Sequence, residues 1–187
     1  MDLTPTPSQT VGPFLHLGLT DTRSVSRVAN DGEKGERLRL TFRVLDGEGV
    51  PVPDAMIEVW QADCEGIYAH YDGTGDNAAF RGFGRLATAD DGSCTFETIK
   101  PGCVPGPGEA VQAPHINVSI LGRGILKRLS TRLYFAGEPA NAADPVLALV
   151  PENRQASLLA QPDPARPGNW ILDVHLRGEG ETVFFDV

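Results

Sequence analysis

The sequence predicts an all-β protein, a single-domain β-sandwich, and three observations favour this fold. The chain of 187 residues contains 21 Gly and 15 Pro, a density of turn formers that suits short strands better than long helices. Several segments alternate apolar and polar residues with a period of two, as strands with one buried face do. No repeat, linker or low-complexity segment divides the chain. We therefore expect one domain over residues 1–187, with an extended arm over 1–30 and the sandwich core over 31–187.

The expected elements begin with the arm, because the three prolines in 4–14 favour extended chain over helix. The first clear strand is 37–44, where four apolar residues alternate with polar ones. The turn formers at 46–49 lead into an apolar run at 55–61, so these two strands are predicted to form a hairpin. The next stretch, 63–84, is rich in glycine, and loops of this length often belong to function.

The second half of the chain adds another hairpin, from 87–89 and 94–99 around the turn 90–93. One short helix is expected over 151–160, where a proline occupies the tolerated first turn. The remaining strands are predicted from alternation and β-branched content: 115–121, 130–135, 170–177 and 182–187.

Charge and composition exclude several classes of function. The net charge of −9 and the pI near 4.8 oppose binding to nucleic acid, whose phosphates would be repelled. No apolar segment is long enough to span a membrane, and the first residues lack the basic and apolar regions of a secretion signal, so a cytoplasmic location is expected. The three cysteines lack the spacing of a zinc site and are expected to be free thiols.

The segment 112–119 is the candidate for chemistry. His115 and Asn117 are two residues apart on a predicted strand and therefore project from the same face. A His-x-His pair at this spacing would offer a metal two imidazoles, whereas a neutral Asn amide is a much poorer ligand for a ferric ion. Taken alone, a single strand histidine is more often a structural residue that is satisfied by hydrogen bonds. The other histidines are isolated in sequence, and no nucleophile motif occurs.

Six segments, in order along nearly the whole chain, carry a family pattern: TPSQTVGPF at 6–14, EVWQAD at 58–63, IKPG at 99–102, APHIN at 113–117, TRLYF at 131–135 and GEGETVFF at 178–185. Together they resemble the intradiol dioxygenase family, and the first and last of them resemble its α chains in particular. The resemblance implies a β-sandwich fold and the ring opening of protocatechuate by O₂ to 3-carboxy-cis,cis-muconate in the β-ketoadipate pathway.

The resemblance also implies a division of labour between two chains. Catalytic members hold a non-haem Fe(III) with two tyrosines and two histidines, the histidines in an Arg-Pro-x-His-x-His pattern. Here the arginine position is Gln112, the first histidine is His115, the second is Asn117, and one tyrosine position is Val104. We expect these four to be vestigial metal-site positions, so that this chain contains no metal and no catalytic residue. The other tyrosine has only an uncertain equivalent in Tyr71.

The same resemblance assigns a partner and a role to this chain. The α and β chains form a heterodimer, which we expect to build a higher oligomer, and the β chain binds the Fe(III) beside a substrate cavity at the interface. The residues expected to form the α side of the cavity wall are Thr10, Gly12, Pro13, Phe14 and Arg132. Gly12 and Pro13 suit close backbone approach in a fixed turn, and Arg132 suits the substrate carboxylate.

Two other interpretations of the sequence stay open. The chain could be a non-catalytic β-sandwich that binds or scaffolds another protein. It could also be a stand-alone iron dioxygenase that uses His115 with Tyr68 or Tyr71. Phenolate bound to Fe(III) absorbs visible light, so the colour and iron content of the purified chain distinguish the last interpretation from the others.

Overall fold

A computed structural model describes residues 5–69 and 80–186. Within these ranges the strands are β1 (Arg37–Leu45), β2 (Met56–Gln61), β3 (Phe83–Ala87), β4 (Ser93–Ile99), β5 (Val104–Pro105), β6 (Val111–Gln112), β7 (His115–Leu121), β8 (Leu129–Phe135), β9 (Leu159–Pro162) and β10 (Asn169–His175). The helical segments are η1 (His16–Thr20), η2 (Pro139–Ala143), η3 (Leu147–Leu149), α1 (Glu152–Gln155) and η4 (Ala156–Leu158).

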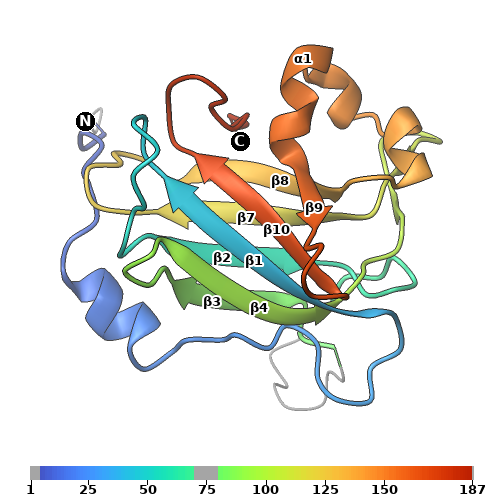
Figure 1. Cartoon of the computed structure of the whole chain (residues 1–187), viewed down its shortest axis with the longest axis horizontal. Coiled ribbons are helices and arrows are strands. Elements are labelled where there is room, and N and C mark those ends of the chain that lie inside the picture. Colours follow the sequence, from blue (N-terminus) through green and yellow to red (C-terminus); the bar gives the residue numbers. More distant parts are fainter. Residues whose placement is uncertain (1–4, 70–79, 187) are drawn as a thin grey trace, which may run out of the picture.

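Two layers of strands face each other across one apolar core. The main sheet has the order β3-β2-β7-β8-β9-β10-β1-β4, and β5 pairs only with β6. Strand β9 pairs with β8 on one side and with β10 on the other, so it joins the layer β3-β2-β7-β8 to the layer β10-β1-β4. Figure 1 shows β10, β1 and β4 crossing in front of β8, β7, β2 and β3. This arrangement confirms the predicted β-sandwich.

The alternation of the strands sets what each layer buries. Along β1 every second residue is buried, and the inward faces of β2, β7, β8 and β10 supply the opposite wall and the flanks of the same core. Phe135 of β8 meets Trp170 of β10 edge to face, with ring centroids 5.1 Å apart, so the two layers interlock near β9. Burying such a side chain stabilises the fold by about 1.5–3 kcal/mol. The outward face of β7 is consequently left free to carry polar residues.

Both predicted hairpins are wrong. Strands β1 and β2 lie in different layers: β1 pairs with β10 and β4, and β2 pairs with β3 and β7. The Asp46 carboxylate accepts hydrogen bonds from Glu48 N and Val50 N, which closes a turn, and the chain then crosses to the opposite layer. The segments 87–89 and 94–99 are separated in the same way, because β3 pairs with β2 whereas β4 pairs with β1.

The end of the chain also differs from the prediction. Residues 182–186 form no strand and contribute one isolated bridge, Ser130 to Phe185, and residue 187 lies outside the described part. The expected helix at 151–160 is confirmed as the short α1, but it continues through η4 directly into β9, a strand that the sequence did not predict. The other helical segments are single turns that were also not predicted.

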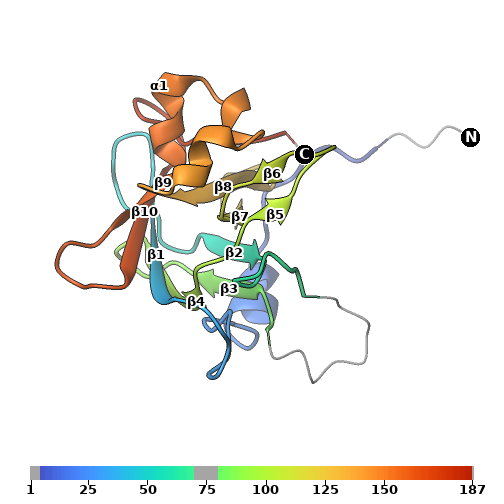
Figure 2. The same ribbon diagram turned by 90° about the vertical axis from the view of Figure 1, so that its right-hand side faces the viewer.

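The arm is held at two places along its length. Residues 5–12 form no helix or strand, and Thr10 fastens them to the turn after β7: Thr10 Oγ1 accepts from Gly124 N at 2.7 Å and donates to Gly122 O at 3.4 Å. After η1, residues 25–29 bridge to Arg85 of β3 and to Glu97 of β4, so they lie across the edge strands of both layers. In Figure 2 the first described residues reach out beyond the strands.

Candidate functional site

The candidate site begins on the outward face of the layer β3-β2-β7-β8. Strand pairing places Trp60, Asn117 and Arg132 in one row across β2, β7 and β8. His115 lies two residues before Asn117 on the same face of β7, yet only 2% of its surface is exposed. The alternation that was expected from the sequence thus brings His115 and Asn117 together.

A tyrosine completes this cluster. The hydroxyl of Tyr68 lies 3.4 Å from His115 Nε2, and Asn117 Nδ2 donates to the same hydroxyl at 3.3 Å. The other ring nitrogen, His115 Nδ1, lies 2.7 Å from the carbonyl oxygen of Ala113. A carbonyl can only accept, so Nδ1 carries the proton and Nε2 is the acceptor that faces Tyr68. We call Tyr68, His115 and Asn117 the β7 cluster.

Local turn chemistry positions Tyr68. The Asp63 carboxylate accepts hydrogen bonds from Glu65 N and Ile67 N, and Gly66 adopts a φ of 81° that a side chain would strain. A Cβ on Gly66 would also collide with the carbonyl oxygen of Cys103. This tight loop returns the chain so that the ring of Tyr68 stacks on Trp60, with centroids 6.0 Å apart.

The tyrosine that contacts His115 is therefore Tyr68, which the sequence offers beside Tyr71 only in the stand-alone dioxygenase interpretation. Tyr71, the uncertain equivalent that the resemblance implies, lies outside the described residues. The signal that could have pointed to Tyr68 is the Asp and Gly turn at 63–66, which brings the residues after it back over β2.

His115 is a neutral histidine by its surroundings. Burial lowers its pKa below the ordinary value of 6.5, and the nearby charge of Arg132 acts in the same direction. The hydrogen bond to Ala113 and the charge of Asp144 oppose this shift without cancelling it. The imidazole is therefore uncharged near neutral pH and serves as a hydrogen-bond acceptor for Tyr68.

These residues do not fit a ferric ion. Tyr68 and His115 are donor types that iron accepts, but the amide of Asn117 is a weak ligand and the side chain of Val104 has no donor atom. Val104 is buried in β5, where it pairs with Gln112 of β6. Nor do any three His, Cys, Asp or Glu side chains gather as a metal-ligand group within residues 5–69 and 80–186.

Arg132 lies beside the β7 cluster at the wall of a groove. Its Nη1 donates to Gln112 Oε1 at 2.7 Å and lies 3.5 Å from the hydroxyl of Tyr134. The groove has a volume of about 710 Å³ and runs over the outward face of β2, β7 and β8. Its walls include Glu58, Trp60, Asn117, Arg132, Leu149 and Phe185. The site therefore combines a fixed cation with an aromatic and apolar rim.

The arm residues are placed apart from Arg132. A Cβ on Gly12 would meet no atom within 4 Å, and the side chain of Phe14 is 79% exposed. Gly12 O accepts a hydrogen bond from Leu15 N, which makes a turn at Pro13. No hydrogen bond or ring contact joins residues 10–14 to Arg132 in the described part of the chain. The arm residues are also not among those that line the groove at Arg132.

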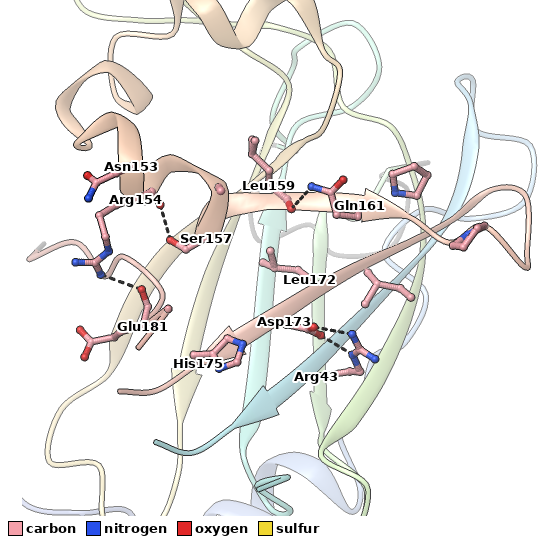
Figure 3. Close-up of a pocket in the computed structure, with 15 residues that line it drawn as sticks. Arg43, Asn153, Arg154, Ser157, Leu159, Gln161, Leu172, Asp173, His175 and Glu181 are labelled. Atoms are coloured by element: carbon pink, nitrogen blue, oxygen red, sulfur yellow. Dashed lines mark hydrogen bonds and ion pairs between the residues drawn. The ribbon is translucent and has the colours of Figure 1, made fainter. Parts of the chain in front are cut away.

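A second groove, of about 470 Å³, lies on the opposite layer between α1 and β10. Figure 3 shows Arg154 and Glu181 at one side, Arg43 and Asp173 at the other, and His175 between them. Arg43 is engaged by Asp173 through Nη2 at 2.6 Å, and Arg154 donates to the carbonyl oxygen of Glu181 at 2.9 Å. The cations here are bound to their own neighbours, and no catalytic constellation is formed.

Comparison with known proteins adds a family to this geometry. A family model described as "Dioxygenase" matches residues 11–169. The chain is 42% identical to the protocatechuate 3,4-dioxygenase alpha chain of Pseudomonas putida, over 97% of this chain and 96% of that one. It is 44% identical to the alpha chain of Burkholderia cepacia, over 97% of each chain. The beta chain of Burkholderia cepacia is 36% identical over 89% of this chain and 75% of its own length.

Solved structures agree with the sequence comparison. The dioxygenase domain of a carbohydrate-binding fusion protein from Streptomyces sp. SirexAA-E superposes with a TM-score of 0.63 at 28% identity, covering 92% of this chain and 99% of that domain. The chain belongs to the intradiol dioxygenase family, as the six segments predicted. Within that family its similarity to the two alpha chains extends over nearly the full length. Among the described residues no helix is long and apolar enough to cross a membrane.

Proposed function

We propose that this chain is the α subunit of a protocatechuate 3,4-dioxygenase, which cleaves 3,4-dihydroxybenzoate with O₂ to 3-carboxy-cis,cis-muconate in the β-ketoadipate pathway. One observation carries the proposal. The chain matches α chains over 97% of its length, and the positions that the resemblance assigns to iron ligands hold Asn117, a weak ligand, and Val104, which has no donor atom.

The iron belongs to the partner in this proposal. The family is one of non-haem iron enzymes, and a β chain would bind the Fe(III), which supplies the chemistry of oxygen insertion between the two hydroxyl-bearing carbons. This chain supplies no ligand. It binds the β chain, which is homologous to it, and with it encloses protocatechuate and O₂.

The work of this chain is to shape the cavity wall. Gly12 leaves space at the backbone, so that a partner or substrate can approach closely. Phe14 offers an exposed apolar ring, and its burial by a partner would be favourable. Arg132 supplies a permanent positive charge whose planar fork matches a carboxylate, so it is suited to orient the carboxylate of protocatechuate.

The test is to purify the chain alone and together with a β chain that has the intact Arg-Pro-x-His-x-His pattern. Iron content, visible absorption and O₂ uptake with protocatechuate are measured for each. We expect the chain alone to be colourless, free of iron and inactive, and the complex to be coloured and active. Full activity of the isolated chain, or failure of the two chains to co-purify, would refute the proposal.

A further inference from the structure

Gln112 holds its side-chain amide in a single orientation. Its Nε2 donates to the carbonyl oxygen of Pro105 at 2.9 Å, and its Oε1 accepts from Arg132 Nη1 at 2.7 Å. Because a carbonyl oxygen can only accept and a guanidinium can only donate, the amide cannot be flipped without losing both bonds. The bond to Arg132 is charge-assisted and short, so it is stronger than the 3.5 Å contact between Arg132 Nη1 and the hydroxyl of Tyr134.

Behind Gln112 lies a buried anchor. The hydroxyl of Tyr134, which is fully buried, donates to Asp144 Oδ1 at 3.0 Å. Burial raises the pKa of Tyr134 to about 12, so the phenol keeps its proton and stays a donor. The carboxylate of Asp144 also accepts from Ala113 N at 2.7 Å and from Leu147 N at 2.7 Å. These bonds fix Tyr134 of β8 against the residue that follows Gln112.

The guanidinium of Arg132 is therefore held through one nitrogen, Nη1. Toward the described residues, only its Nη1 is hydrogen-bonded, to Gln112 and more weakly to Tyr134. No hydrogen bond engages Nε or Nη2 in the described part of the chain, and Arg132 lines the groove opposite Asn117. A guanidinium that is fixed by one edge presents its other edge in a defined direction, which reduces the conformational entropy lost when a carboxylate binds.

We propose that Gln112 is a positioning residue that aims Arg132 at a carboxylate ligand in the groove, with Tyr134 and Asp144 as the support of that arrangement. This inference rests on the proposed function, since it identifies protocatechuate's carboxylate as the group that Arg132 meets. It also gives a physical reason for a neutral acceptor at position 112. A cation there would stand within hydrogen-bond distance of Arg132 and repel it.

The experiment uses the assembled complex with the variants Arg132→Ala, Gln112→Ala and the double variant. The substrates are protocatechuate and catechol, which lacks the carboxylate. Binding of 4-hydroxybenzoate, which has the carboxylate but no second hydroxyl, is measured by calorimetry. Gln161→Ala is the matched control, because Gln161 also donates to a backbone carbonyl but lies at the groove of the opposite layer.

We expect Arg132→Ala to raise the KM for protocatechuate and the Kd for 4-hydroxybenzoate by about 10- to 100-fold, the loss expected for a hydrogen bond to a charged group. Gln112→Ala should raise both by about 3- to 10-fold, with kcat nearly unchanged, and should add nothing in the Arg132→Ala background. Catechol kinetics should not change in any variant, and Gln161→Ala should match the parent.

Three results would overturn the inference: an effect of Gln112→Ala that is equal for catechol and protocatechuate, one that persists in full without Arg132, or no effect at all. The proposed function is judged separately, since iron content and co-purification of the complex test it and do not depend on Gln112. A complex that assembles and turns over but fails these comparisons refutes the positioning role alone.

Discussion

At the scale of single residues, His115 shows how a side chain of a type that can bind a metal is satisfied by hydrogen bonds instead. The ring stays in the strand and keeps one lone pair directed at Tyr68, as a ligand would. However, Asn117 donates to the same hydroxyl, and the buried ring is uncharged. The three side chains satisfy each other, which a buried polar group requires if it is not to cost about 1–3 kcal/mol of stability. The β7 cluster is therefore held together by hydrogen bonds between its own residues.

The lowered pKa of His115 predicts a pH dependence of stability. In the unfolded chain this group takes up a proton as the pH falls through about 6.5, whereas the folded chain takes it up only at lower pH. The free energy of unfolding should therefore decrease as the pH falls below about 6.5 and become level only below the folded pKa. Burial, the charge of Arg132 and the opposing charge of Asp144 are the groups that set this window.

The variant His115→Gln checks this prediction, because it keeps a polar side chain that does not titrate. Urea unfolding between pH 5 and 8 should show a smaller loss of stability toward low pH in the variant than in the parent. His175→Gln is the control, since His175 lies at the edge of the opposite layer. Equal slopes for the parent and for His115→Gln would show that His115 is charged or exposed in the folded chain.

At the scale of elements, strand β7 contributes to the core with one face and to the candidate site with the other. The inward residues of β7 belong to the core, and its outward residues form the β7 cluster and the floor of the groove. The arm is a separate element whose position depends on the turn that follows β7, through Thr10. The arm is thus attached beyond the end of β7, whereas Arg132 lies on β8 opposite Asn117.

The Thr10 attachment predicts an effect on function without an effect on folding. Thr10→Val removes both hydrogen bonds to the turn and should leave residues 5–14 free to move. The chain should lose at most about 1 kcal/mol of stability, because the bonds are partly exposed. The activity of the complex with the β chain should fall about 3- to 10-fold, because a free arm loses conformational entropy when it is ordered against the β chain.

Thr6→Val is the matched control for the arm, because Thr6 is an exposed threonine of the same segment. Activity and urea unfolding are measured for both variants. If Thr6→Val and Thr10→Val have the same activity, the attachment at Thr10 does not position the arm.

The sequence predicts the elements better than their partners. Alternation correctly located β1, β7, β8 and β10, because a period of two reports which face is buried. It could not show that β1 joins β10 and β4, since every partner in a sandwich buries the same kind of face. Strand β9 was missed because it is only Leu159–Pro162 and directly follows a helical turn, and its pairing is fixed by long-range contacts.

The site was predictable where a residue type carried the information. The chemistry of the side chains alone gives Asn117 only a weak donor for iron and Val104 none. The contact of Tyr68 with His115 and the hydrogen bond between Gln112 and Arg132 needed the fold, because they depend on a loop and on a two-stranded sheet that bring distant residues together. The sequence singles out Gln112 only through the resemblance, and its hydrogen bonds to Pro105 and Arg132 are visible only in the fold.

At the scale of the whole molecule, the two layers and the arm depend on one another. The core is shared by both layers, and residues 25–29 bridge to the edge strands of each. The surface that we propose for a partner therefore lies on a structure whose two layers share one core. An exposed aromatic side chain on such a structure calls for a different explanation from a buried one, because it contributes little to folding.

Phe135 and Phe14 make a matched pair that separates folding from assembly. Phe135→Ala removes a fully buried ring at the contact of the two layers and should lower the free energy of unfolding of the isolated chain by about 3–5 kcal/mol. Phe14→Ala removes an exposed ring and should change that free energy by no more than about 0.5 kcal/mol.

The affinity for the β chain should instead depend on Phe14, because a partner that covers this ring makes it an anchor of the interface. We expect Phe14→Ala to lower that affinity about 10-fold or more. Urea unfolding of the isolated chain and titration with the β chain measure the two quantities. If Phe14→Ala binds the β chain as tightly as the parent does, the β chain leaves this ring in water. The arm would then not be part of the cavity wall.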